Sequence, residues 1–131
     1  MKKIGIINSE LSRVISELGH TDTLVIADSG LPIPSGVTRI DLALRRGVPG
    51  YFETLETILE EMQVERYTIA HEMKNSNPEL HEKTRQALDG VSEESVSHEE
   101  FKRLTRNAKA IIRTGECTPY ANVILHAGVT F

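Results

Sequence analysis

The sequence contains no apolar run long enough to span a membrane, only one cysteine and no excess of positive charge. A membrane-spanning helix needs about 20 predominantly apolar residues, and the core of a secretion signal needs about 7–15. The apolar segment near the N-terminus, residues 4–7, is shorter than either and ends at Asn8. The lone Cys117 has no partner for a disulfide within the chain, which favours a reducing compartment. These features predict a cytoplasmic protein without membrane insertion.

Other absences exclude whole classes of function. The net charge is -4 and there is no basic stripe, so nucleic acid is not an expected partner. Five histidines are present, but the sequence has no HxxxH, HExxH or CxxC spacing, and no metal is expected. No GxGxxG or Walker A motif indicates a nucleotide site. Cys117 has no lysine or arginine within three residues, and we expect it to be a packed thiol.

What the 131 residues do contain is an alternation of helix and strand signals without a linker or repeat, which predicts a single domain over residues 1–131. Leu11, Val14, Ile15 and Leu18 recur at helical spacing, and residues 23–27 form the short apolar run of a buried strand. Further helices are expected at 52–62, at 78–89 and from 98, and further strands at 39–44, 66–71, 91–96, 110–113 and 122–127. This rhythm predicts an α/β sandwich with a mixed or parallel sheet.

Several residues mark where the expected helices begin and end. Gly19 stands where a left-handed glycine would close the first helix. Asn77 and Pro78 have the order of an N-cap and a first helical residue. Ser97 and Glu100 have the spacing of a capping box, which predicts that a helix begins directly after Ser97.

His20 and Asp28 are candidate functional residues because they flank the first strand. In α/β sheets, sites gather beyond strand ends and at neighbouring helix termini. The negative end of the preceding helix, together with Asp22 or Asp28, would favour an imidazolium at His20, which suits general acid–base work. The alternative is a surface histidine that caps helix carbonyls. Asp28 could accept hydrogen bonds from paired hydroxyl groups, or it could begin an Asx turn.

Two further pairs of polar residues are candidates for binding. His98 and Lys102 lie four residues apart on the last expected helix, with Phe101 on its buried side, so they share a face. They could grip a neutral polyol, or they could form a solvated face. Tyr120 and Asn122 lie two apart at the start of an apolar strand, so their side chains are expected to point the same way. They could bind hydroxyl groups, or they could be the polar edge of the strand.

Three stretches of the sequence are specific enough to carry a family resemblance. They are LGHTDTLVIADSGLPIP at 18–34, RTGECTPYANVILHAG at 113–128 and KIGIINSEL at 3–11. With these stretches the chain resembles, essentially from end to end, the family of D-ribose pyranases and their fucose-mutarotase relatives. The resemblance is to the ribose branch of that family.

The resemblance implies a fold, an assembly and a reaction. The fold is a three-layer α/β/α sandwich with a mixed, mostly parallel central sheet, assembled into ring-like homo-oligomers, decamers, with sites close to subunit contacts. The reaction interconverts the β-pyranose and β-furanose forms of D-ribose and supplies furanose for ribose utilisation. No cofactor is implied, because opening and closing a hemiacetal involves no redox change. The absence of tryptophan fits a small sugar held by hydrogen bonds rather than by stacking.

The resemblance also implies roles for the candidate residues. His20 is the catalytic proton donor, and the residues that bind the sugar are Asp28, His98, Lys102, Tyr120 and Asn122. Two other functions fit the same residues: a non-catalytic sugar-binding accessory protein of ribose uptake, and a mutarotase for the anomers of another sugar such as fucose. Faster ring exchange at catalytic protein concentration distinguishes an enzyme from the accessory protein, and turnover on fucose tests the other mutarotase.

Overall fold

The apolar run at 23–27 forms the centre of the fold. In a computed structural model that describes residues 1–131, it is strand β1 (Thr23–Ala27), and its last four residues are buried. Successive residues of a strand face opposite sides of the sheet. Leu24 and Ile26 belong to the larger apolar cluster, and Val25 and Ala27 belong to the smaller one. Both faces of the sheet are therefore covered, as in an α/β sandwich.

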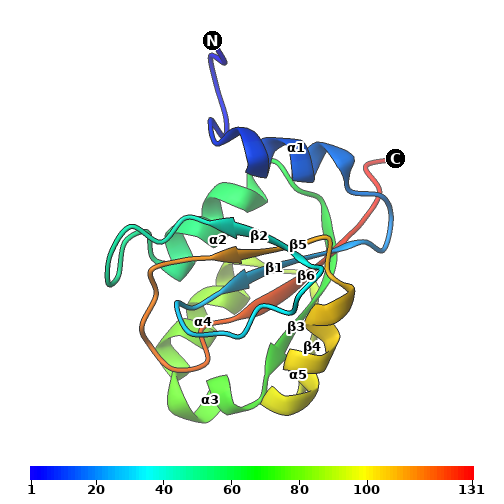
Figure 1. Cartoon of the computed structure of the whole chain (residues 1–131). Helices are drawn as coiled ribbons and strands as arrows, with labels where there is room; N and C mark the ends of the chain where they lie inside the picture. The colour runs from blue at the N-terminus through cyan, green and yellow to red at the C-terminus, as the bar shows by residue number, and fades with distance from the viewer.

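Six strands and five α-helices alternate along the chain (Figure 1). The other strands are β2 (Thr38–Asp41), β3 (Val64–Ala70), β4 (Ser92–Val96), β5 (Ala110–Arg113) and β6 (Val123–Ala127). The helices are α1 (Ser9–Glu17), α2 (Tyr51–Leu59), α3 (Glu72–Ser76), α4 (Pro78–Ala87) and α5 (His98–Leu104), followed by the 3-10 turn η1 (Thr105–Asn107). None of these helices has the length and apolar character that a membrane crossing requires.

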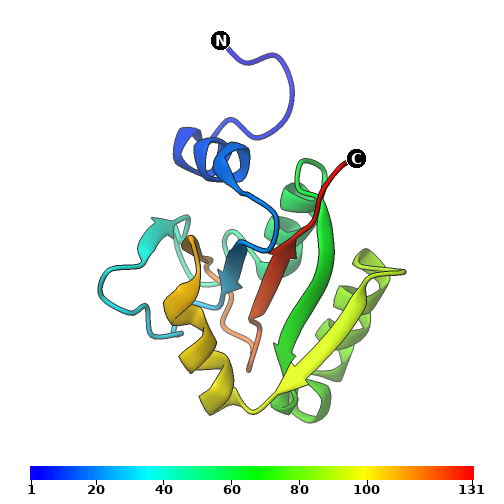
Figure 2. The same ribbon diagram turned by 90° about the vertical axis from the view of Figure 1, so that its right-hand side faces the viewer.

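The strands form one sheet in the order β2-β5-β1-β6-β3-β4. β6 pairs antiparallel with β1 and β3, whereas all other neighbours are parallel, so the expected mixed, mostly parallel sheet is confirmed (Figure 2). We call the edge where β1 ends at Ala27 and β6 begins at Val123 the carboxyl edge. We call the opposite edge, where β1 begins at Thr23 and β6 ends at Ala127, the amino edge.

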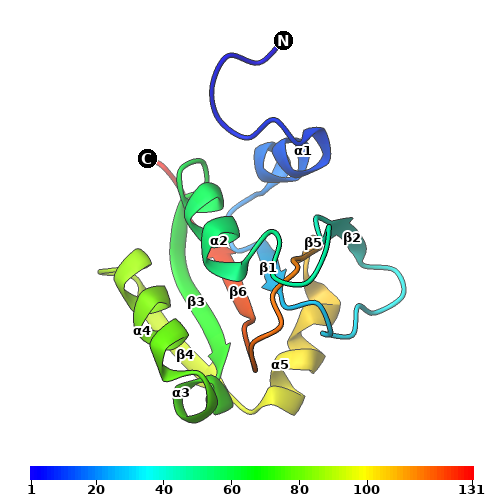
Figure 3. The same ribbon diagram turned by 90° about the vertical axis from the view of Figure 1, so that its left-hand side faces the viewer.

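Helices cover both faces of this sheet and give three layers (Figures 2 and 3). Leu55 and Ile58 of α2 pack with Leu11 of α1 in the larger cluster, and α4 adds the partly buried Leu80. Phe101 of α5 fills the smaller cluster on the other face. The three-layer α/β/α sandwich is therefore confirmed.

Both ends of the chain lie beside α1, at the amino edge (Figure 1). They expose large apolar side chains, namely Ile4, Ile7 and Phe131. An exposed loop between β2 and α2 adds Leu44. Leu44 follows β2, which runs parallel to β5 and β1, so it lies at the carboxyl edge. Contiguous exposed apolar patches mark surfaces that contact another protein.

The helix expected at 52–62 is present, but it begins one residue earlier and ends three residues earlier than predicted. α2 begins at Tyr51 and ends at Leu59, and Tyr51 is fully buried whereas Phe52 is only partly buried. The Tyr51 hydroxyl lies 3.0 Å from Oγ1 of Thr84 in α4, and burial raises the pKa of Tyr51 well above its usual range. This buried hydrogen bond turns the tyrosine inward, which the apolar spacing did not predict.

Other boundaries differ less. The strand expected at 39–44 ends at Asp41, because residues 44–48 fold into a turn closed by the Arg45–Val48 bridge. The short helix α3 was not expected. Ser97 caps α5 as predicted, and its Oγ accepts from the Glu100 N–H at 3.1 Å. The other half of the capping box is not formed, because the Glu100 carboxylate binds Arg103.

Candidate functional site

Asp28 and Asn122 meet at the carboxyl edge, although they lie far apart in the sequence. The Asn122 Nδ2 donates to Oδ2 of Asp28 at 3.0 Å, and the Asp28 N–H donates to Oδ1 of Asn122 at 2.8 Å. They meet because β1 ends where the antiparallel β6 begins. Asn122 is fully buried, so its amide holds the Asp28 carboxylate from the interior side.

The Asp28 carboxylate keeps free acceptor capacity. Its Oδ1 accepts from the Gly30 N–H at 2.9 Å, which is the Asx turn considered as an alternative. A carboxylate has about four acceptor positions, and Gly30 and Asn122 use one on each oxygen. The Asx turn therefore orients Asp28 and still leaves room for two hydroxyl donors.

His98 lies at the same edge and has an unpaired nitrogen. Its ring stacks on Phe101 with the centroids 6.5 Å apart and meets Tyr120 edge-on at 5.0 Å. The His98 Nδ1 is buried and has no hydrogen-bond partner within the chain. The great majority of buried polar atoms are paired. The His98 Nδ1 is thus a polar atom at this edge whose hydrogen bonding is not met within the chain.

Tyr120 does not lie in a strand, which corrects the expectation that it and Asn122 project alike. β6 begins at Val123, and the Asn122 N–H donates to the Tyr120 carbonyl at 2.9 Å in a tight turn. Tyr120 has φ 54°, a left-handed conformation that costs a non-glycine residue energy and is frequent at functional sites. The turn, rather than strand alternation, sets the direction of both side chains.

Asn77 also lies at the carboxyl edge, although the sequence predicted it only as the N-cap of a helix. Its side chain makes no helix-capping bond, whereas Pro78 begins α4 as predicted. The Asn77 Nδ2 donates instead to Oγ1 of Thr118 at 2.9 Å and to the Pro119 carbonyl at 3.0 Å. Asn77 therefore anchors the loop that leads to Tyr120.

Cys117 lies in the same loop and is exposed, so the expectation of a packed thiol is wrong. Its Sγ is 3.3 Å from Oγ of Ser29. The Ser29 N–H donates to the Glu116 carbonyl at 2.8 Å, which ties the loop after β1 to the loop before β6. The cysteine is exposed because the chain crosses the open edge of the sheet here.

Lys102 shares α5 with His98 but has its own surroundings. Its Nζ pairs with Oε1 of Glu99 at 2.7 Å. The side chain lines a hollow of about 380 Å³ between α5 and the loop Pro32–Pro34. The structure thus leaves Lys102 beside the candidate site, paired with Glu99 rather than bonded to Asp28 or His98.

His20 lies at the amino edge, away from the other candidates. α1 ends at Glu17, and Leu18 is extended with its N–H bonded to the Ile15 carbonyl, so Gly19 is not the expected left-handed cap. His20 is therefore beyond the helix end, and its Nε2 lies 2.8 Å from Oε2 of Glu65 in β3. The five residues of β1 separate it from Asp28, a span of about 16 Å at the usual rise of a strand.

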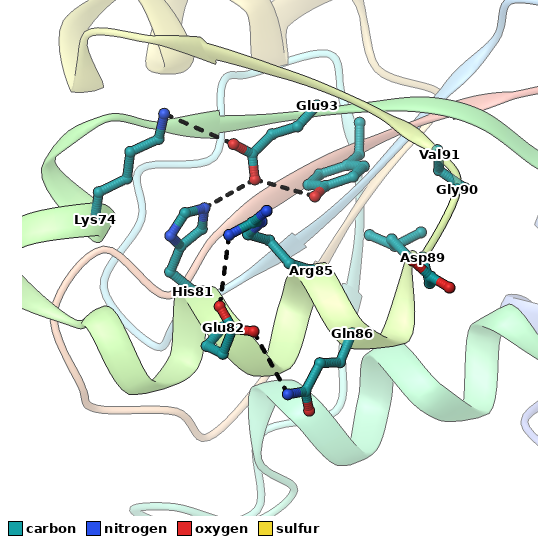
Figure 4. A pocket seen from close by; sticks show the side chains of 11 residues that line it. Lys74, His81, Glu82, Arg85, Gln86, Asp89, Gly90, Val91 and Glu93 are labelled. Atoms are coloured by element: carbon teal, nitrogen blue, oxygen red, sulfur yellow. Dashed lines mark hydrogen bonds and ion pairs between the residues drawn. The ribbon is translucent and has the colours of Figure 1, made fainter.

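A hollow of about 660 Å³ lies between α4 and β4 and not at either of these places (Figure 4). Several of its polar groups bind one another: Glu93 binds His81 at 2.8 Å, Tyr67 at 3.0 Å and Lys74 at 3.6 Å. Burial alone would raise the pKa of Glu93, but the hydrogen bonds from His81 and Tyr67 lower it overall. Because three neighbouring side chains bind the Glu93 carboxylate, this network indicates a structural role for Glu93.

No three His, Cys, Asp or Glu side chains converge in a metal-binding geometry. The carboxyl edge instead offers one carboxylate, one imidazole nitrogen and one phenol hydroxyl, from Asp28, His98 and Tyr120. Hydrogen-bond donors and acceptors without an apolar cavity suit a small, neutral ligand with several hydroxyl groups.

Comparisons with known proteins agree with this chemistry. A family model described as the RbsD / FucU transport protein family matches residues 1–130. A D-ribose pyranase of Laribacter hongkongensis (strain HLHK9) is 58% identical over 131 residues, which are 100% of both chains. The structure of Bacillus subtilis RbsD complexed with D-ribose has a TM-score of 0.98 and 53% identity over 100% of both chains. A fucose mutarotase of Streptococcus pneumoniae, solved in complex with L-fucose, has a TM-score of 0.82 and 26% identity over 100% of both chains. The chain therefore belongs to the RbsD/FucU family.

Proposed function

We propose that the chain interconverts the pyranose and furanose forms of D-ribose without a cofactor, and that it supplies furanose for ribose utilisation in the cytoplasm. The observation that carries this proposal is the carboxyl edge, where Asp28 keeps free acceptor positions and the His98 Nδ1 is buried without a partner. Two relatives support the choice of sugar and reaction. The B. subtilis relative is described with D-ribose bound, and the L. hongkongensis relative is named D-ribose pyranase.

The carboxyl edge binds the sugar through hydroxyl groups. Asp28 accepts from two neighbouring hydroxyls, and His98 and Tyr120 each bind one more. Asn122 is fully buried, so it acts by holding the Asp28 carboxylate in place. Lys102 contacts the sugar from the neighbouring hollow along α5. Each bond is modest in water, but several in one fixed array select a single arrangement of hydroxyls.

Ring exchange needs a proton at two places. The ring oxygen must be protonated while the anomeric hydroxyl loses its proton, which opens the hemiacetal to the free aldehyde. Closure through a different hydroxyl then forms the other ring. His20 is the proton donor for the ring oxygen, and an acid–base group placed in this way typically accelerates a reaction about 10²–10⁴-fold.

His20 reaches the sugar from a second copy of the chain. Within one chain, β1 separates it from Asp28, so the amino edge of one copy must meet the carboxyl edge of the next. A contact between two different surfaces repeats head to tail, and it forms a closed ring when the rotation between successive copies closes on itself. The exposed Ile4, Ile7 and Phe131 at the amino edge supply apolar area for this contact. We therefore propose a ring-like homo-oligomer, and the family resemblance implies that such rings form a decamer.

Saturation-transfer NMR on D-ribose tests the proposal. The protein at catalytic concentration should accelerate exchange between the pyranose and furanose signals. His20→Ala should assemble normally and lose at least about a hundredfold in rate, at the lower end of the contribution of an acid–base group. A normally assembled His20→Ala protein with the parental exchange rate would refute the role of His20, and a parental protein without any acceleration would refute the activity.

Two other functions have an observation in their favour. The matching family is described as a transport protein family, which suits a sugar-binding accessory protein that binds D-ribose without accelerating ring exchange. The fucose mutarotase of S. pneumoniae shares the fold at 26% identity, which suits turnover on L-fucose. Comparing exchange rates on D-ribose and L-fucose at equal protein concentration separates all three functions.

A further inference from the structure

His20 has a partner at the amino edge that its sequence position did not predict. Its Nε2 lies 2.8 Å from Oε2 of Glu65, and the two side chains are 51% and 40% exposed. Glu65 comes from β3, 45 residues further along the chain. We propose that Glu65 is a positioning residue, which holds the His20 ring so that Nδ1 faces the sugar. This inference rests on the proposed function.

The backbone around Glu65 is irregular at this residue. In the β3–β6 pairing, Val64 lies opposite Ala127 and Arg66 lies opposite His126, so Glu65 is the extra residue of a β-bulge. A bulge redirects a side chain out of the regular alternation and is frequent beside active sites. A Cβ at Gly128 would lie 3.1 Å from Cβ of Glu65, a tight contact, so the glycine eases the close approach of the two segments.

The backbone around His20 is also held in an unusual conformation. Thr21 has φ 74°, which is rare for a β-branched residue. Two hydrogen bonds maintain it: the Gly19 N–H donates to Oδ2 of Asp22 at 2.9 Å, and the Thr21 N–H donates to the Ala127 carbonyl at 2.9 Å. Strained residues persist only where their surroundings fix them, and they concentrate at functional sites.

These features distinguish the pair from an ordinary surface ion pair. Arg13 and Glu17 of α1 also lie 3.0 Å apart and are exposed, but they lie one turn apart on a regular helix, where such contacts arise without special geometry. The pair of His20 and Glu65 instead joins a strained turn to a bulge. Two local distortions converge on one hydrogen bond.

The chemistry of the pair decides which nitrogen is free. An ionised carboxylate only accepts hydrogen bonds, so the Nε2 of His20 must carry a hydrogen and Nδ1 is the nitrogen left for the substrate. As an imidazolium, His20 gives its Nδ1 proton to the ring oxygen of ribose. The bond between this oxygen and the anomeric carbon breaks as the anomeric hydroxyl loses its proton to water, which leaves the aldehyde and a neutral imidazole. Ring closure reverses these transfers through another hydroxyl, while Nε2 stays bonded to Glu65.

Kinetics of ring exchange in the assembled protein tests the role of Glu65. Glu65→Ala should lower kcat about ten- to hundredfold, because an orienting carboxylate of a histidine has effects of at least this order. The KM for D-ribose should stay within about twofold, since Glu65 does not touch the sugar. Glu65→Gln keeps an acceptor oxygen for the Nε2 hydrogen and should recover part of the loss. Glu17→Ala removes an exposed carboxylate from a surface pair and should leave both constants unchanged.

A double variant separates positioning from a general structural effect. Adding Glu65→Ala to His20→Ala should lower the rate no further, because Glu65 acts only through His20. Two results would overturn the inference even though His20→Ala has lost its activity. One is a rate for the double variant that is lower than that of His20→Ala by the full factor that Glu65→Ala alone costs. The other is a parental kcat for a Glu65→Ala protein that assembles normally. A fully active His20→Ala protein would instead refute the proposed role of His20, and the inference with it.

Discussion

Replacing Asn122 by aspartate would place two carboxylates face to face in the interior. The amide of Asn122 is fully buried, and its Nδ2 donates to Oδ2 of Asp28 at 3.0 Å while its Oδ1 accepts from the Asp28 N–H at 2.8 Å. Asn122→Asp keeps the shape and the second of these bonds. It exchanges the donor in the first bond for another acceptor oxygen.

The energy of this change can be worked out from the distance. Two unit charges about 3 Å apart repel by roughly 5.5 kcal/mol at an effective dielectric constant of about 20. Keeping one carboxyl protonated at pH 7 costs about 4 kcal/mol, since an aspartate has a reference pKa of about 3.9 and each unit is worth about 1.36 kcal/mol. Protonating one carboxyl costs less than keeping both charged. The folded variant should therefore bind a proton that its unfolded chain does not bind. Its deficit in stability should therefore be about 4 kcal/mol at pH 7 and shrink by about 1.4 kcal/mol for each unit of pH down to about 5.

Urea unfolding at pH 5, 6 and 7 measures this slope. The protein concentration must be the same in every sample, because assembly contributes to the apparent stability. Asn122→Ala is the matched control: it loses both hydrogen bonds to Asp28 but adds no charge, so its deficit relative to the parent should not change with pH. If Asn122→Asp shows the same pH-independent deficit as Asn122→Ala, the two side chains do not face one another in the way described.

Three further changes have expected outcomes. Tyr120→Phe removes one hydroxyl from the sugar site and should weaken D-ribose binding about three- to tenfold by calorimetry, and an unchanged affinity would exclude that contact. Asn77→Ala leaves the loop before Tyr120 without its two bonds and should lower the free energy of unfolding by about 1–3 kcal/mol, whereas an unaltered urea midpoint would mean that the loop is held by other contacts. Burial, and secondarily Arg66, lowers the pKa of His126 below 6.5, so the unfolded chain binds more protons below this pH and stability should fall as the pH drops through it. His126→Gln should flatten this dependence between pH 7 and 5, and an equally steep loss in the variant would assign the acid sensitivity to other groups.

The sequence predicted the fold well where one residue pattern had one explanation. β1 is apolar on both faces, and a run this short with turn signals at both ends favours a buried strand between two layers. The strand at 39–44 and the helix at 52–62 were less accurate. The end of the strand depends on a local turn closed by the Arg45–Val48 bridge. The start of the helix depends on the buried hydroxyl pair of Tyr51 and Thr84, which joins two segments distant in the sequence.

The candidate site was predictable in part for the same reason. Polar residues at the ends of apolar strands marked Asp28 and Asn122, and the antiparallel course of β6 brings them together. The separation of His20 from Asp28 follows from the length of β1. That one site would then need residues from two copies of the chain becomes clear only when the residues at both edges of the sheet are known. Glu65 could not be predicted, because a bulge shifts the alternation at that residue and leaves no pattern in the sequence.

Mixing two inactive variants tests the shared site most directly. His20→Ala and Asp28→Ala, each inactive alone, would be unfolded together in equal amounts and refolded into mixed assemblies. If each site takes His20 from one copy and Asp28 from the next, about one site in four is intact in a random ring, so about a quarter of the parental rate of D-ribose ring exchange should return. A mixture that assembles normally and shows no more activity than the separate variants would contradict the account.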